Sequence, residues 1–128
     1  MGMFRRKGRL SVLVVDDEPG IRQMLDMALS VRGMTVTGAS DGASGLAAAR
    51  AKTPDVIICD VMMPGMDGFE VTRRLRSDPH LRDIPVILLT ALAGDMDQWQ
   101  GWSAGAASYV TKPVDPELLV SEVKRVTS

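Results

Sequence analysis

The chain has 128 residues, of which 45% are hydrophobic and 24% are charged, and its formal net charge is −1. These values predict one soluble globular domain, and they give no sign of a surface for nucleic acid or for an anionic membrane. The single cysteine, Cys59, excludes an internal disulfide, and no apolar run reaches the length of a membrane span, so we expect a cytoplasmic protein.

The N-terminal segment, residues 1–9, is basic. We expect a flexible arm here and not a signal peptide, because the apolar run that follows, 12–15, ends in three acids and is too short for the hydrophobic part of a signal. The domain itself is expected to occupy residues 10–128.

The first half of the chain alternates short apolar runs with helical patterns. Pro19 is expected to open a helix whose apolar residues recur every three or four positions, and Gly33 is expected to end it. Asp41 has the position of a cap for a second helix. Strands are predicted at 12–15, 34–38 and 55–60.

The same alternation continues in the second half. Asp67 and Glu70 have the spacing of a capping box, which predicts a helix, and Asp115 is expected to cap the last helix. A weaker helix is predicted from Asp95 to about residue 104, because Gly101 interrupts its pattern. Strands are predicted at 84–90 and 108–111.

This alternation predicts an α/β fold, with a parallel sheet covered by helices on both faces. The chain is too short for an eight-stranded barrel, which takes about 250 residues, so an open five-stranded sheet is expected. In such sheets, functional sites form at the carboxyl ends of the strands.

Polar residues follow the predicted strands at these ends. Asp16 and Asp17 come directly after the first strand, and Asp60 ends the third. Three converging carboxylates repel one another unless a cation joins them, and Mg²⁺ prefers such oxygen ligands. The main-chain carbonyl of Met62 is a further candidate ligand. The sequence therefore predicts a magnesium site at this edge.

Two more polar residues lie at the same edge: Thr90 ends the fourth predicted strand, and Lys112 follows the fifth. A carboxylate such as Asp60 can attack phosphorus, and phosphoryl transfer then requires alignment and charge neutralisation. The Lys112 ammonium and the Thr90 hydroxyl can interact with the phosphoryl oxygens. Each residue alone has a simpler structural explanation, but together Asp60, Thr90 and Lys112 predict a phosphoryl-transfer site.

Four segments of the chain carry specific motifs: Val14–Glu18, Asp60–Gly68, Pro85–Ala91 and Gly105–Pro113. Together they resemble the receiver domain of two-component response regulators, and the resemblance covers about residues 10 to 127. The resemblance implies a flavodoxin-like (βα)5 fold with strand order 2-1-3-4-5.

The resemblance also implies roles for the residues of the site. Asp60 would accept a phosphoryl group from a phosphohistidine on a sensor kinase or a histidine phosphotransfer protein. Asp17 would bind Mg²⁺ directly and Asp16 mainly through water, with Asp60 and the Met62 carbonyl as the other protein ligands. The Lys112–Pro113 bond would be cis.

Further residues would transmit the signal. Thr90 and Tyr109 would form a switch pair, in which Thr90 moves toward the phosphoryl group and Tyr109 rotates inward. Trp102 is expected on an exposed face near Tyr109, where the two would form a partner surface. Trp99, one turn earlier, is expected to pack inward.

The function predicted is a phosphorylation-activated switch that signals by binding an unknown output protein, without direct contact to nucleic acid or membrane. It is not expected to be an enzyme, beyond catalysing its own phosphorylation and dephosphorylation. A receiver excised from a larger regulator and a phosphate-independent docking module remain alternatives. An aspartate-nucleophile phosphatase is disfavoured, because it would need an acid in place of Met62. A flavin-binding flavodoxin is also disfavoured, because the acids at 16–18 would repel the flavin phosphate.

Overall fold

The computed structural model describes residues 9–91 and 94–128, so the predicted arm at 1–9 lies, apart from Arg9, outside the described residues. The strands are β1 (Ser11–Val15), β2 (Thr35–Ala39), β3 (Val56–Asp60), β4 (Val86–Thr90) and β5 (Ser108–Thr111). The helices are α1 (Pro19–Ser30), α2 (Gly42–Ala51), α3 (Gly68–Ser77), α4 (Asp95–Ala104) and α5 (Pro116–Thr127).

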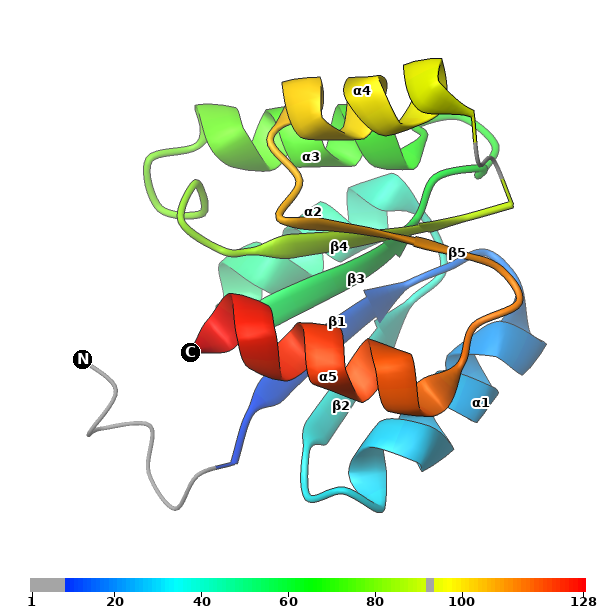
Figure 1. Ribbon diagram of the computed structural model, residues 1–128. Helices are drawn as coiled ribbons and strands as arrows, with labels where there is room; N and C mark the ends of the chain where they lie inside the picture. Colours follow the sequence, from blue (N-terminus) through cyan, green and yellow to red (C-terminus); the bar gives the residue numbers. More distant parts are fainter. Residues whose placement is uncertain (1–8, 92–93) are drawn as a thin grey trace.

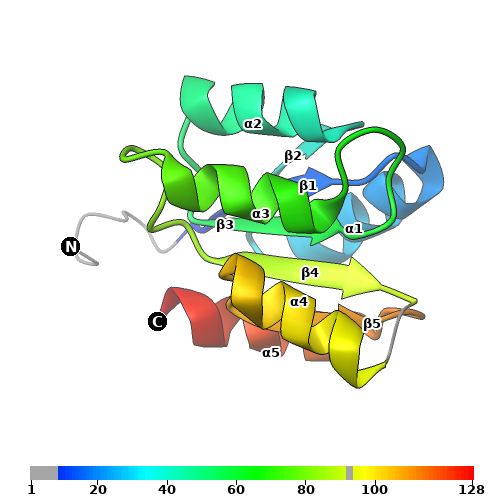
Figure 2. The ribbon, with the colours of Figure 1, turned by 90° about the horizontal axis from the view of Figure 1, so that it is seen from above.

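The strands form one parallel sheet in the order β2-β1-β3-β4-β5 (Figure 1). Helices α1 and α5 cover one face, and α2, α3 and α4 cover the other (Figure 2). The predicted flavodoxin-like fold and strand order are therefore confirmed. Among the described residues, no helix is both long and apolar enough to span a membrane.

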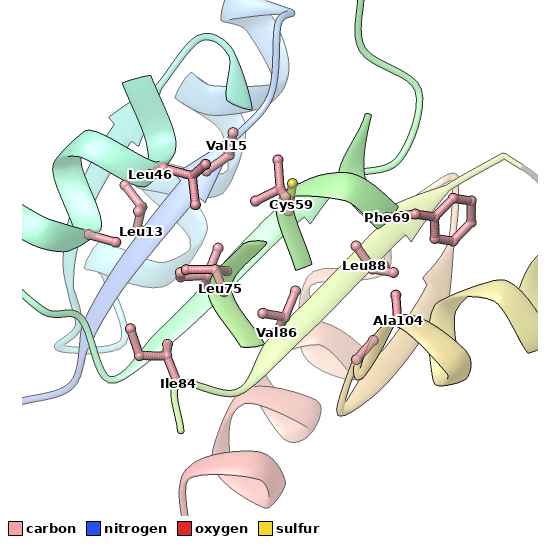
Figure 3. Packing of buried hydrophobic residues seen from close by; sticks show 14 of the residues in the cluster. Leu13, Val15, Leu46, Cys59, Phe69, Leu75, Ile84, Val86, Leu88 and Ala104 are labelled. Atoms are coloured by element: carbon pink, nitrogen blue, oxygen red, sulfur yellow. The ribbon is translucent and has the colours of Figure 1, made fainter. Parts of the chain in front are cut away.

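The core has two layers because alternate residues of each central strand point to opposite faces of the sheet. Ile57 and Cys59 pack on the side of α2, α3 and α4, as Figure 3 shows for Cys59, whereas Ile58 packs on the side of α1 and α5. All five residues of β3 and of β4 are buried, as expected for central strands of a parallel sheet. Burial raises the pKa of the Cys59 thiol, which is a free cysteine of the core.

The helix caps agree with the predictions in part. Asp41 and Ser44 form a complete capping box at the start of α2. At α3, the Asp67 carboxylate accepts a hydrogen bond from the Glu70 N–H at 2.9 Å, which is the first half of the predicted capping box. In the second half, the Glu70 carboxylate would accept from the Asp67 N–H. The Glu70 carboxylate accepts instead from the side chain of Arg74, at 3.0 Å.

Element boundaries differ from the predictions by a few residues. Helix α1 ends at Ser30, and Gly33 lies in the turn that follows, with φ 86°. Strand β4 begins at Val86 and not at residue 84, because Pro85 has no N–H to donate to a sheet partner.

Helix α4 turns its small residues toward the sheet. Gly101 and Ala104 are buried, whereas Trp99 and Trp102 are 61% and 51% exposed. The expected exposure of Trp102 is thus observed, but the prediction that Trp99 packs inward was wrong. A Cβ at Gly101 would lie only 2.9 Å from the Tyr109 ring, so no room exists for a tryptophan between α4 and β5.

Candidate functional site

Three carboxylates meet at the carboxyl ends of two neighbouring strands. Strands β1 and β3 pair with Val15 opposite Cys59, so the residues that follow, Asp16 and Asp60, lie side by side. Carboxylate oxygens of Asp16, Asp17 and Asp60 all lie within 4.8 Å of one another. Asp16 is fully buried, Asp60 is only 3% exposed and Asp17 is half-buried, so most of the cluster is shielded from solvent; we call this edge of the sheet the recess.

Lys112 supplies a positive charge at this cluster. Its Nζ lies 3.2 Å from Asp60 Oδ1 and 3.8 Å from Asp16 Oδ2. The main-chain N–H of Lys112 donates to the Thr90 carbonyl at 2.7 Å, which ties the segment after β5 to the end of β4. The Lys112–Pro113 bond is cis, as predicted.

Burial and charge act together on the ionisation of the site. Burial raises the pKa of Asp16, the Glu18 N–H opposes this shift, and the charge of Asp60 adds to it. Burial also raises the pKa of Asp60, against the attraction of Lys112. For Lys112, burial favours a lower pKa, but the charges of Asp60 and Asp16 outweigh burial and raise it. Asp16 and Asp60 are therefore harder to ionise than usual while Lys112 stays charged.

The donor set fits a hard divalent cation. Asp16 Oδ2 is buried without a hydrogen-bond partner, which is costly for a carboxylate oxygen unless it has a charged ligand. The neighbouring acceptors are also carboxylate oxygens, the type of ligand that Mg²⁺ prefers. The Met62 N–H donates to Asp60, so the residue predicted to offer its carbonyl is already in contact with the acceptor.

The predicted switch residues are in contact. Thr90 is fully buried at the end of β4, and a side-chain hydrogen bond joins it to Tyr109. Burial raises the pKa of Tyr109, and the bond to Thr90 opposes this shift. Trp102 lies outside the recess, on the exposed side of α4.

Two residues that sequence reasoning missed hold the site in place. The Arg22 guanidinium, on α1, donates to the main-chain carbonyl of Asp16 at 2.6 Å. A Cβ at Gly68, the first residue of α3, would lie 2.5 Å from the Asp60 carbonyl oxygen. The neighbouring residues Asp67 and Gly68 are typical of a turn, so the sequence indicates a turn here. The sequence around Gly68 does not indicate that this glycine lies against Asp60.

The sequence matches the model of the response regulator receiver domain over residues 12–124. The chain belongs to the response regulator receiver domain family. The recess at the ends of β1, β3 and β5 is thus the candidate site of a receiver domain, and the resemblance on which the sequence prediction rested is confirmed.

Curated relatives of this receiver domain are longer proteins. It is 46% identical to the response regulator PleD of Caulobacter vibrioides over 91% of this chain and 26% of that protein. It is 45% identical to the probable transcriptional regulatory protein TcrX of Mycobacterium tuberculosis over 95% of this chain and 52% of that protein. The chain therefore spans about a quarter of the length of PleD and about half of the length of TcrX.

A solved structure of similar size has the same fold. Chemotaxis protein CheY4 of Vibrio cholerae is 37% identical to this receiver domain, with a TM-score of 0.88, over 93% of this chain and 99% of that chain.

Proposed function

We propose that this receiver domain is a phosphorylation-controlled signalling switch in which Asp60 accepts the phosphoryl group. The observation that carries the proposal is the ion pair between Lys112 Nζ and Asp60 Oδ1, 3.2 Å long, inside a recess that also holds two further carboxylates. A buried acid with a fixed cation beside it is suited to receive a group that brings additional negative charge.

Mg²⁺ is the proposed cofactor, held by Asp17, Asp60 and the Met62 carbonyl, with Asp16 acting mainly through water. When bound, the cation neutralises charge on the carboxylates and on a phosphoryl oxygen. Asp16 Oδ2 supports this assignment, because it is a buried acceptor without a hydrogen bond, and Lys112 Nζ reaches it only to 3.8 Å.

The proposed donor is a phosphohistidine on a sensor kinase or a histidine phosphotransfer protein. An Asp60 oxygen forms a bond to phosphorus while the phosphorus–nitrogen bond breaks, and the imidazole leaves with the electron pair. Lys112 stabilises the charge of the phosphoryl oxygens from its position 3.2 Å from Asp60, and the Thr90 hydroxyl donates to another oxygen. The domain catalyses this transfer on itself alone, and likewise the later attack of water that releases inorganic phosphate and restores the Asp60 carboxylate, so it is not an enzyme that turns over a substrate.

Signal output is proposed to pass through Thr90 and Tyr109 to a protein partner. Thr90 shifts toward the phosphoryl group, Tyr109 follows because the two are hydrogen-bonded, and Tyr109 with the exposed Trp102 forms the surface that the partner reads. Trp102→Ala should weaken that binding, and equal affinity of variant and wild type in both phosphorylation states would count against this surface.

The proposed partner is a protein and not a nucleic acid, in a cytoplasmic setting where the sensor kinase presents its phosphohistidine. The net charge of −1 gives this chain no basic excess for a phosphate backbone. RpaA of Synechocystis, a DNA-binding transcriptional regulator by name, is 42% identical, but this chain covers only 47% of it.

Acetyl phosphate with Mg²⁺ tests the proposal. Intact-mass spectrometry should show one added phosphoryl group on the wild type, and beryllofluoride should change tryptophan fluorescence. Asp60→Ala should abolish both responses, whereas Asp83→Asn, which removes an exposed acid far along the chain from the site, should keep both. A wild type that shows neither response would refute the phosphoacceptor and favour the phosphate-independent docking module.

A further inference from the structure

Helix α4 contains a glycine at the point where it touches the switch tyrosine. Gly101 is buried in the middle of α4, which lies beside α3 and over β5 (Figure 2). A glycine inside a helix destabilises it relative to alanine, so its presence requires a reason in packing or function. The reason here is contact, because the Tyr109 ring occupies the space where a side chain at 101 would stand.

The contact distances show which group would have to move if this space were filled. A Cβ at 101 would lie 2.9 Å from Tyr109 Cδ2 and 3.3 Å from Tyr109 Cε2, whereas Leu88 Cδ1 would be at 3.4 Å, an ordinary contact. The Tyr109 ring packs against the hydrophobic core from a half-buried position, so it has a path toward solvent. A side chain at 101 would therefore displace the Tyr109 ring and not Leu88.

Tyr109 holds this inward position through two contacts. The ring fits against Gly101, and its hydroxyl group is hydrogen-bonded to Thr90, at the end of the strand beside Asp60. A side chain at 101 would oppose the inward ring and so weaken the bond to Thr90.

We propose that Gly101 sets the resting position of Tyr109, and thereby how readily the domain responds to phosphorylation. The inference rests on the proposed function, and it adds a residue that regulates the same site without touching the phosphoryl group. A domain whose tyrosine is already inward needs less free energy from the phosphoryl group to complete the switch.

The test compares Gly101→Ala with Ser103→Ala, an exposed position of the same helix that also gains helix propensity. Tyr109 is the only tyrosine of the chain, so ¹³C-labelled tyrosine gives ring signals of one residue. In Gly101→Ala without phosphate, these signals should shift, and the half-saturating beryllofluoride concentration should rise by about fivefold. Ser103→Ala should change neither quantity.

A Tyr109→Ala background shows whether Gly101→Ala acts through the tyrosine ring or through helix α4 itself. In Tyr109→Ala no ring opposes a side chain at 101, so adding Gly101→Ala should leave the beryllofluoride affinity of that background unchanged. If the loss of affinity persists in this background, or if Gly101→Ala in the wild type leaves ring signals and affinity unaltered, the inference is overturned. A wild type that does not respond to beryllofluoride would refute the proposed function instead, and the ring signals would still report whether Gly101 positions Tyr109.

Discussion

The buried acids of the recess should make the metal-free protein less stable than it could be, and Asp16→Asn should reveal this cost. Asp16 is fully buried, and its Oδ2 lacks a hydrogen-bond partner. The substitution removes one of three converging charges, keeps a side-chain oxygen for the Glu18 N–H, and provides an amide that can donate to Asp60. We expect a higher free energy of unfolding for the variant in EDTA at neutral pH.

The distances give the size of the effect. Two like charges 4.8 Å apart repel by about 3.5 kcal/mol at an effective dielectric constant of about 20, and Asp16 has two acids within this distance. The opposite charge of Lys112, 3.8 Å from Asp16 Oδ2, attracts Asp16 by about 4.4 kcal/mol. A net repulsion of about 2.5 kcal/mol remains, so a gain of about 2 kcal/mol is expected for Asp16→Asn.

The pH dependence identifies the cause. Because the pKa of Asp16 is raised in the folded state, the folded protein binds this proton more tightly than the unfolded chain, and stability is lost as the pH rises from 3.8 through the raised value. The advantage of the variant should therefore shrink as the pH falls toward 3.8. Mg²⁺ should reduce the advantage at neutral pH, because it stabilises the wild type that binds it.

Urea unfolding followed by circular dichroism measures these differences, with Asp83→Asn as the control for losing one exposed negative charge. The control should unfold like the wild type. If Asp16→Asn is less stable than the wild type in EDTA, or if its advantage does not change with pH, attraction to Lys112 outweighs repulsion and the reasoning is refuted.

Three further substitutions test contacts of the site and of the surrounding fold. Gly68→Ala should lower the free energy of unfolding in urea by about 1–3 kcal/mol, because a Cβ would lie 2.5 Å from the Asp60 carbonyl oxygen, whereas Gly20→Ala, with nothing within 4 Å, should not. Arg76→Met should cost about 2–3 kcal/mol in thermal unfolding, because it removes the donor to the carbonyls of Arg82, Ile84 and Gly105, and an unchanged melting temperature would contradict this. Lys112→Met should slow phosphorylation by acetyl phosphate about 10²-fold, measured by intact mass, and an unchanged rate would exclude its proposed role.

The fold and the acidic cluster could be predicted because their signals are local. The apolar run of β3 and the acid that ends it are neighbours in sequence, and the rule that parallel strands end at one edge brings Asp16 and Asp60 together. The contact between Lys112 and Asp60 follows from the same rule, one strand further away.

The rest depends on contacts between segments that no local pattern encodes. Trp99 was predicted inward from its place one turn before Trp102, but the close approach of α4 to Tyr109 leaves room only for Gly101. The reach of Arg22 to the Asp16 carbonyl likewise depends on how α1 lies against the sheet. Such positions are decided by packing, which tertiary structure alone reveals.

The recess is assembled from residues that are far apart in the chain. Asp16 follows the first strand, Asp60 ends the third, and Lys112 follows the last strand of the sheet, so their contacts exist only when the whole sheet is complete. A growing or truncated chain that contains Asp60 but lacks Lys112 has the carboxylate without its paired cation. If Asp60 accepts a phosphoryl group as proposed, phosphorylation therefore requires a folded sheet that includes β5, because the Lys112–Asp60 contact forms only then.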